Sequence, residues 1–351
     1  MNVLMIGVDE KTKGGMWTVA KHYLSDTYLS REIRLKYIAT ATAGSKVNKI
    51  LHFLRAMFDI LFELLFHQWD IVHVHMAERG SFYRKRIVIA VSRLLGRRVV
   101  LHMHGAEFET WYHSLPDKRK HLVEKCLNEA DCILILGEYW RSFIASLIKD
   151  PQKITVLYNA VHVPGENRYS PGAQHLLFLG EVGQRKGIYD LLTALTLIDP
   201  ALPKENTLLI FGPNPDGDIC ERINHLGLNG RVRYMGWLDE GRKAEIFSKT
   251  AVNILPSYHE GLPMAILESM AHGIPNIATN VGAIPEAIHD NNGAIIAPGD
   301  RRALAEQILH LVLNDAKRME KSHRAHQTAL QRFSMEHHAV QLVNVYRSLL
   351  K

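Results

Sequence analysis

The chain has 351 residues, of which 47% are hydrophobic and 22% charged, so it can form two packed cores and does not have the composition of a disordered protein. Residues 1–163 hold 23 Lys and Arg against 16 Asp and Glu, an excess of +7, whereas residues 164–351 hold 19 against 20. This asymmetry favours an anionic partner for the first half, such as nucleic acid, an acidic membrane surface or a lipid pyrophosphate.

Strand-like and helix-like stretches alternate along the whole chain, which predicts parallel sheets with crossover helices. In the first half we expect strands over 3–8, 33–40, 70–75, 98–104, 132–137 and 154–159. A polar stretch with Pro and Gly, 164–174, indicates a linker. The alternation then resumes over 175–180, 207–212, 232–237, 251–256, 275–280 and 293–298. The pattern predicts an α/β protein with two Rossmann-like, doubly wound domains that bind ligands at the carboxyl ends of their strands.

The loop after the first strand contains Gly14 and Gly15, directly before a helix that opens near Met16. Paired glycines allow a backbone to approach a phosphate closely. Two glycines in such a loop are, however, more often a simple turn. The Gly-x-Gly-x-x-Gly spacing of dinucleotide-binding proteins is absent here.

The segment from Lys46 to Trp69 has apolar residues at a helical period, at positions 47, 50, 51, 54, 57, 58, 61, 64 and 65. Its charged residues argue against a transmembrane helix. One interpretation is a helix packed on the sheet of its own domain, which is the commoner origin of a wide apolar stripe. The other is a helix that lies on a bilayer, next to the basic segment 83–86 and to Arg93, Arg97 and Arg98.

His102 and His104 alternate on the fourth expected strand, and Gly105 follows them. Alternate residues of a strand share a face, so the two imidazoles resemble half of a metal site. No third ligand follows at an obvious spacing, which argues against zinc. The alternatives are a structural histidine and a substrate-binding one.

Two features of the second half concern anions and metals. Arg185 and Lys186 stand at an expected helix start, where basic residues are unfavourable, so an external anion is expected to compensate them. Asp216 and Asp218 form an Asp-x-Asp pair of the kind that holds divalent cations in other enzymes. They lie in a Pro-Asn-Pro loop, where Asp and Gly mostly form turns, so we do not expect a metal there.

The most informative segment runs from Ser257 to Glu286. Glu260 and Glu268 stand eight residues apart, with Gly261 and Pro263 between them and a helix-patterned run from Met264. Glu260 is therefore expected on the loop before the helix and Glu268 about one turn inside it. The unpaired N–H groups of the helix N-terminus between them form an anion site. This combination suits a sugar joined to a nucleotide through a diphosphate.

This segment resembles the Glu-x7-Glu motif of the retaining, nucleotide-sugar-dependent glycosyltransferases of family four, which have the GT-B fold. The resemblance implies two Rossmann-like domains that face a cleft, 1–163 on the acceptor side and 164–334 on the donor side. It also implies that a final helix within 335–351 crosses back onto the first domain. The motifs are most specific over 175–300.

The resemblance also implies roles for individual residues. Glu260 would contact hydroxyls of the donor sugar and His104 would orient that sugar, as the catalytic pair. Glu268 would bind the ribose, and the remaining implied donor-binding residues are Gly14, Gly15, Arg185, Lys186, Gly261, Leu262, Pro263, Met264 and Ala265. Many family members carry Arg where this chain has Glu181. Arg185 and Lys186 would therefore supply all the positive charge that neutralises the diphosphate.

The predicted reaction is metal-independent transfer of a hexose or hexosamine to an acceptor hydroxyl with retention of configuration, without a cofactor beyond the nucleotide-sugar co-substrate. Alternatives within the same fold are a sugar-nucleotide 2-epimerase and a sugar-nucleotide-binding protein without turnover. The expected acceptor is a polyprenyl-diphosphate-linked oligosaccharide of bacterial surface-polysaccharide assembly, and nucleic acid is not an expected partner.

The expected location is cytoplasmic, with peripheral binding at the cytoplasmic face of the inner membrane. The chain has three cysteines, Cys126, Cys132 and Cys220, an odd number without metal-ligand spacing, as is typical of a reducing compartment. Residues 1–10 lack the basic region of a signal peptide.

Overall fold

The computed structural model describes residues 1–12 and 14–351, and the chain forms two compact units. Unit 1 comprises Met1–Ala160 together with Met335–Lys351, and unit 2 comprises Val161–Ser334. The boundary therefore lies three residues before the expected one, and the last helix belongs to unit 1. The first and last residues of unit 2 lie side by side, since the Val161 N–H donates to the Phe333 carbonyl over 2.9 Å.

Unit 1 is built on a six-stranded parallel sheet in the order β2-β1-β3-β4-β5-β6. Its strands are β1 (Asn2–Gly7), β2 (Arg34–Ala39), β3 (Ile71–Met76), β4 (Arg98–Met103), β5 (Cys132–Ile135) and β6 (Ile154–Val156). The central strands are buried on both faces and are mostly apolar, apart from the histidines of β3 and β4. The strand order reverses between β1 and β3, so loops diverge there at the carboxyl edge.

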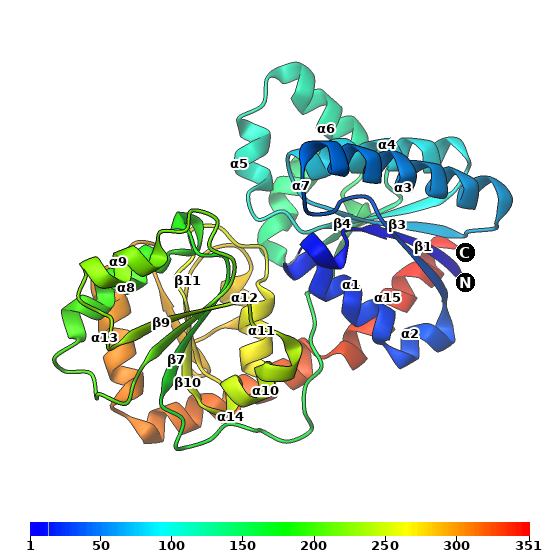
Figure 1. Ribbon diagram of the computed structural model, residues 1–351. Coiled ribbons are helices and arrows are strands. Elements are labelled where there is room, and N and C mark those ends of the chain that lie inside the picture. The colour runs from blue at the N-terminus through cyan, green and yellow to red at the C-terminus, as the bar shows by residue number, and fades with distance from the viewer. Residues whose placement is uncertain (13) are drawn as a thin grey trace. The chain divides into compact units, whose positions relative to one another are not determined.

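Helices cover both faces of this sheet (Figure 1). On one face lie α3 (Lys46–Phe66) and α4 (Gly80–Leu94), and on the other lie α1 (Gly15–Ser25), α2 (Thr27–Glu32) and α15 (Met335–Leu349). The remaining helices of unit 1 are α5 (Phe108–His113), α6 (Asp117–Glu129) and α7 (Arg141–Leu147), with short 3-10 turns at Glu10–Thr12, Glu138–Trp140 and Pro151–Lys153.

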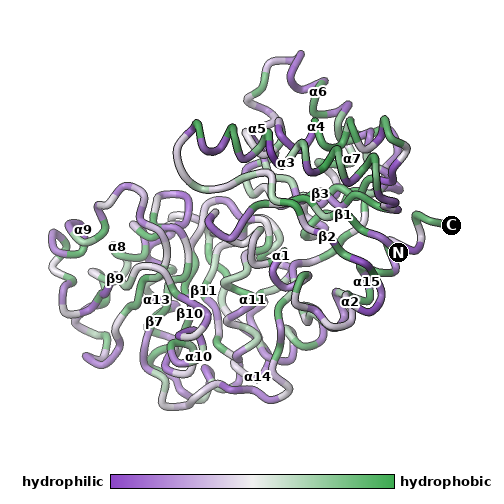
Figure 2. The backbone as a smooth tube through the Cα atoms, turned by 45° about the vertical axis from the view of Figure 1, so that its right-hand side comes forward, coloured by the Kyte–Doolittle hydropathy of each residue, from purple (hydrophilic) through white to green (hydrophobic). Residues whose placement is uncertain are grey.

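Helix α3 packs on its own unit through a narrow strip of side chains and exposes most of its apolar residues. Only Ala56, Ile60, Glu63 and Leu64 of this helix are buried. Hydrophobic colour nevertheless recurs along its whole length (Figure 2). The large apolar side chains that face solvent are Val47, Ile50, Leu51, Leu54, Phe58, Leu61, Phe62, Leu65 and Phe66, and we call them the α3 apolar face. In the described part of the chain, no helix is long and apolar enough to cross a membrane.

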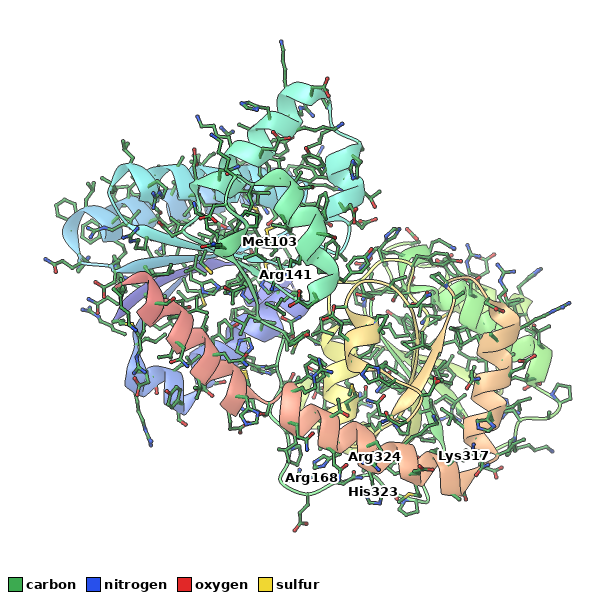
Figure 3. The ribbon with its side chains drawn as sticks, turned by 180° about the vertical axis from the view of Figure 1, so that it is seen from behind. Met103, Arg141, Arg168, Lys317, His323 and Arg324 are labelled. Atoms are coloured by element: carbon green, nitrogen blue, oxygen red, sulfur yellow. The ribbon has the colours of Figure 1, made fainter. Side chains whose placement is uncertain are left out.

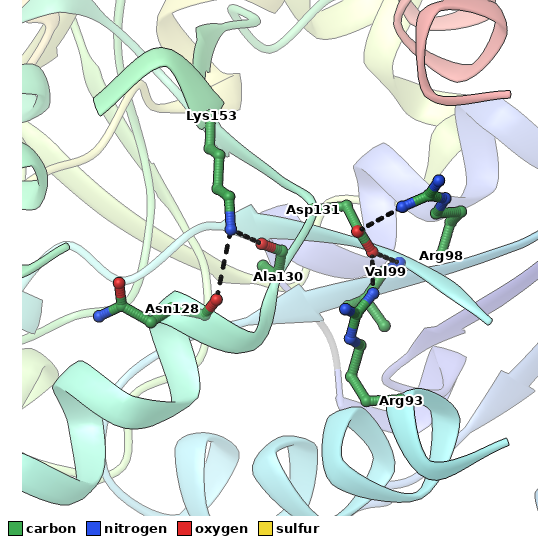
Figure 4. A network of polar contacts seen from close by, with 7 residues as sticks. All are labelled: Arg93, Arg98, Val99, Asn128, Ala130, Asp131 and Lys153. Carbon is green, nitrogen blue, oxygen red and sulfur yellow. Dashed lines mark hydrogen bonds and ion pairs between the residues drawn. The ribbon is translucent and has the colours of Figure 1, made fainter. Parts of the chain in front are cut away.

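Four of the basic residues expected beside this helix are engaged within unit 1. Lys85 is completely buried and donates from Nζ to the Gly7 carbonyl over 2.6 Å and to Thr40 Oγ1. Arg93 and Arg98 bind the two carboxylate oxygens of Asp131 over 2.6 and 3.1 Å (Figure 4). Arg97 donates to backbone carbonyls of Leu64 and Trp69 at the end of α3.

Unit 2 repeats the architecture with the strand order β12-β11-β10-β7-β8-β9, all parallel. The strands are β7 (His175–Leu179), β8 (Leu208–Phe211), β9 (Val232–Gly236), β10 (Thr250–Leu255), β11 (Asn276–Thr279) and β12 (Gly293–Ile296). The helices are α8 (Ile188–Ile198), α9 (Ile219–His225), α10 (Glu240–Ser248), α11 (Met264–Ala271), α12 (Ile284–Ala287), α13 (Arg301–Val312) and α14 (Asp315–Arg332), and a 3-10 turn spans Gln184–Lys186. The two expected parallel, doubly wound sheets are confirmed.

Helix α14 illustrates how unit 2 covers its core. Lys317, His323 and Arg324 point outward along the helix (Figure 3). On its inner side the buried Arg318 donates from Nε to the Tyr169 hydroxyl over 2.7 Å. The alternation of charged and buried positions at a helical period is the pattern of an amphipathic surface helix.

Candidate active site

The candidate donor-binding residues of unit 2 come from the two loops that leave its sheet at the switch point. Strands β7 and β10 are neighbours, and the strand order runs outward from this pair in both directions. The loop after β7 carries Arg185 and Lys186, and the loop after β10 carries Glu260. In open α/β sheets, ligands bind in the crevice that such loops leave at the carboxyl edge. The topology thus brings these three side chains together.

Glu260 is a buried carboxylate that faces a lysine. Its Oε1 accepts from Lys186 Nζ over 2.5 Å and from Ser257 Oγ over 2.6 Å. The side chains of Glu260 and Lys186 are 5% and 14% exposed. A buried ion pair is destabilised strongly when one partner is removed, because the other charge is left unpaired. The pair therefore links the side chains of the two loops.

Backbone contacts fix the same two loops to each other. The Tyr258 N–H donates to the Arg185 carbonyl over 2.8 Å, and Arg185 Nη1 donates to the His259 carbonyl over 3.3 Å. Gly187 has φ +70°, and a Cβ there would lie 2.0 Å from the Pro256 carbonyl oxygen. Only glycine permits this close approach.

A polar network that the sequence did not predict holds the loop that carries Glu260. The Tyr258 hydroxyl donates to Asp190 Oδ2 over 2.8 Å, and Arg301 Nε donates to Asp190 Oδ1 over 2.7 Å. Asp190 is only 2% exposed. These residues lie 68 and 111 positions away from Asp190 in the sequence, so no local pattern could have linked them.

The segment from Gly261 to Ala265 forms the entry into α11 and is held close to its neighbours. The Gly261 carbonyl accepts from the Ala283 N–H over 2.9 Å, and a Cβ on Gly282, which has φ +55°, would meet the Glu260 carbonyl at 2.0 Å. The Leu262 and Met264 side chains are buried. Any contact of these residues with a ligand would therefore come from the backbone of the segment, at the N-terminal end of α11.

Glu268 lies in the second turn of α11 and forms an ion pair. Its Oε1 accepts from Lys243 Nζ over 2.9 Å, and Lys243 also contacts Glu240 over 2.9 Å. Burial lowers the pKa of Lys243, but attraction to Glu268 and Glu240 outweighs burial, so this pKa is raised above its ordinary value. Lys243 was not identified from the sequence, because it lies on α10, 25 residues away.

The expected position of Arg185 and Lys186 at a helix start needs correction. They lie in a 3-10 turn, and Gly187 separates them from α8. The charge of Lys186 is compensated by Glu260, so no external anion is required to explain its position.

Asp218 of the Asp-x-Asp pair is bound by Arg222, whose hydrogen bond lowers the Asp218 pKa. No cluster of three possible metal ligands in the described residues includes Asp216 or Asp218.

The candidate residues of unit 1 lie at the carboxyl edge of its sheet. Gly14 precedes α1 with φ 154°, and Gly15 is the first residue of that helix, whereas Lys13 of the same loop lies outside the described residues. His104 follows β4, and its Nε2 lies 2.8 Å from His75 Nδ1. Burial lowers the His104 pKa to about 3, so its imidazole is neutral at physiological pH.

His104 borders a cluster of buried imidazoles. His73 and His75 on β3 and His102 on β4 are completely buried. The sequence supplied the signal, a His-x-His on each of two expected strands, but strand pairing was needed to bring them together. The three rings that lie close enough to share a metal ion are those of His73, His75 and His102, and His104 is not one of them.

Comparison with known proteins identifies both halves of the chain. Residues 173–314 match the family model described as glycosyl transferases group 1, and residues 27–163 match glycosyltransferase family 4. The O-antigen chain mannosyltransferase B of Escherichia coli is 27% identical over 271 residues, which is 72% of this chain and 71% of that protein.

Two further matches are a second relative from Escherichia coli and a solved structure. The UDP-Gal:alpha-D-GlcNAc-diphosphoundecaprenol alpha-1,3-galactosyltransferase of Escherichia coli is 27% identical over 283 residues, 72% of this chain and 68% of that protein. The structure of HepE from Anabaena in complex with UDP and glucose has a TM-score of 0.78 at 17% identity and covers 99% of this chain and 100% of that one. This structural match extends over both units and confirms the GT-B fold. The chain therefore belongs to the GT-B-fold glycosyltransferases of group 1 and family 4.

Proposed function

We propose that this glycosyltransferase transfers a hexose or hexosamine from a nucleoside diphosphate sugar to a hydroxyl of a lipid-linked oligosaccharide, with retention at the anomeric carbon. The observation that carries the proposal is the Lys186–Glu260 pair at the switch point of unit 2. This pair would offer a cation to a diphosphate and a carboxylate to sugar hydroxyls, within one hydrogen bond of each other and close to the start of α11.

Lys186 and Glu260 bind different parts of the donor in this proposal. The diphosphate competes with Glu260 for Lys186, together with Arg185 and the first N–H groups of α11. Glu260 is then free to accept hydrogen bonds from sugar hydroxyls and to stabilise the positive charge that develops on the sugar as the diphosphate leaves. His104, as a neutral imidazole, orients the sugar by a hydrogen bond. Catalysis on this scheme is positioning and electrostatic stabilisation, without a divalent cation.

The lipid-linked acceptor is supported by the α3 apolar face and by the relative that acts on a diphosphoundecaprenol-linked sugar. Nine large apolar side chains on one helix form a surface that water solvates poorly. An amphipathic helix of this kind lies in the interface of a bilayer with its apolar face buried. We infer peripheral binding at the cytoplasmic face of the inner membrane, in the assembly of a surface polysaccharide.

A donor panel tests the reaction class. The protein is incubated with UDP-, GDP- and ADP-sugars, with and without an N-acetylglucosamine diphosphate carrying a short alkyl chain, in EDTA. We expect one donor to yield free nucleoside diphosphate and a product whose new linkage has the donor's anomeric configuration. Inversion would contradict retention. Sugar isomerisation would indicate an epimerase, binding without turnover would indicate a binder, and restoration of activity only by Mg²⁺ or Mn²⁺ would contradict metal independence.

Replacing Glu268 by Ala is expected to weaken nucleotide binding by about 10-fold or more, because a ribose hydroxyl loses a charged hydrogen-bond acceptor. Turnover at saturating donor should change less, since this contact is made in ground and transition states alike. Glu240→Ala is the matched control, because Glu240 contacts the same Lys243 at the same 2.9 Å distance but is exposed. Calorimetry that finds equal affinities in the two variants would remove Glu268 from the nucleotide site.

A further inference from the structure

The histidine cluster of unit 1 has the geometry of a metal-binding site. His73 and His75 are two residues apart on β3 and so share a face, and His102 on β4 is in register with His75. One ring nitrogen from each of these three residues lies within 4.8 Å of those of the others. His73 Nε2 and His102 Nδ1 are 3.2 Å apart, close to the roughly 3.3 Å that separates two ligands bound at 2.0–2.1 Å to one tetrahedral zinc ion.

Hydrogen bonds orient two of the rings in the way that metal-bound histidines are usually oriented. His73 Nδ1 lies 2.6 Å from the Tyr346 hydroxyl, and His75 Nδ1 lies 2.8 Å from His104 Nε2. Each contact occupies one ring nitrogen and fixes the ring. Histidine ligands commonly use their second nitrogen for such an outer contact, and the remaining nitrogen binds the metal.

Two ring nitrogens of the cluster have no hydrogen-bond partner among the described residues. These are Nε2 of His75 and Nε2 of His102, and both are buried; with His102 bound through Nδ1, a metal ion would account for the first of them only. An unpaired polar atom in a protein interior is costly and calls for an explanation, of which an ion is one.

We propose that His73, His75 and His102 bind one divalent transition-metal ion, of which Zn²⁺ is the chemically best-suited, in the interior of unit 1. Imidazole ligands suit Zn²⁺ and its neighbours in the first transition row, whereas Mg²⁺ and Mn²⁺ prefer oxygen. Three ligands leave a fourth position for water, and zinc-bound water ionises readily to hydroxide.

The ion would affect the candidate active site by fixing which ring nitrogen of His75 carries the hydrogen. With a metal on His75 Nε2, the hydrogen of that ring must sit on Nδ1 and donate to His104 Nε2. His104 would then keep its hydrogen on Nδ1 as a donor for substrate. This consequence rests on the proposed role of His104, whereas the metal site itself does not.

The test measures metal content and affinity in full-length protein without a histidine tag. The wild type is depleted with a chelator, titrated with Zn²⁺ and analysed by elemental mass spectrometry after gel filtration. We expect about one zinc per chain and a melting temperature raised by about 5 °C or more in excess zinc. His75→Asn should abolish both effects. The matched control is His113→Asn with His121→Asn, two exposed histidines of the same unit, which should leave both unchanged.

Two outcomes overturn the proposal. The first is zinc binding that is absent from the wild type, or unchanged in a folded His75→Asn protein, which would indicate a hydrogen-bonded structural cluster with adventitious surface binding. The second comes from X-ray absorption of the zinc-loaded wild type, which needs no variant. Three imidazole nitrogens at about 2.0 Å are expected, and a sulfur or all-oxygen ligand set would exclude this site. Neither readout depends on glycosyl transfer, so the proposed reaction can fail independently.

Discussion

Replacing Glu260 by Gln is expected to lower turnover about 100-fold or more, because the neutral amide stabilises a developing positive charge poorly. The same change leaves Lys186 facing an amide in a site where both side chains are largely buried. Loss of one partner of a buried ion pair typically destabilises a protein by about 3–5 kcal/mol, although an amide that still accepts a hydrogen bond should cost less. A lower melting temperature is therefore expected together with the loss of activity.

Ser257→Ala separates these two effects. Ser257 donates to the same Glu260 oxygen over 2.6 Å, but its removal keeps the Lys186–Glu260 pair. The variant should lose about 1 kcal/mol of stability, typical of one hydrogen bond, with only a small loss of turnover. The measurements are donor turnover and thermal unfolding of both proteins at matched folded fraction. Turnover of Glu260→Gln within a few-fold of the wild type would show that this carboxylate does not contact the reacting sugar.

Replacing Leu54 and Phe58 by Glu is expected to abolish binding to acidic liposomes. Both side chains are exposed on the α3 apolar face, at 58% and 70%. Insertion of two such groups into a bilayer contributes about 3 kcal/mol, so their loss should lower partitioning by roughly 100-fold. Flotation of the protein with liposomes measures this. High salt should have a smaller effect, because Lys85, Arg93, Arg97 and Arg98 are engaged within unit 1.

The matched control for the membrane test lies in unit 2. Leu197 and Leu313 have similar exposures, 57% and 61%, and their replacement by Glu changes the net charge equally. This variant should float as the wild type does. If the wild type does not bind acidic liposomes at low salt, or if both double variants lose binding equally, the α3 apolar face does not bind membranes.

Local sequence patterns predicted the elements well. Each of the twelve expected strands is present with its bounds shifted by a few residues, because central parallel strands are short apolar runs between turn-forming residues. The placement of Glu260 before α11 and Glu268 within it also followed from local rules, since Gly261, Pro263 and Gly273 mark the ends of that helix.

Local patterns failed where a side chain's environment depends on its partner. The apolar period of α3 indicated a helix, but a period cannot distinguish an apolar face that packs on a sheet from one that meets solvent. The basic excess of the first half was real in composition, yet several of its cations are bound by Asp131 or by backbone carbonyls. Net charge is a sum over residues and contains no information on pairing.

The sequence by itself determined the order and type of the elements, the doubling of the sheet and the Glu-x7-Glu segment, because each depends on residues within about one element of each other. Only the tertiary structure decided which groups meet. Lys186 reaches Glu260 across 74 residues, Asp190 reaches Arg301 across 111, and His73 and His102 meet across 29. Parallel strand order brings such distant residues to one sheet edge, and that order is set by packing of the whole domain, beyond the reach of any local pattern.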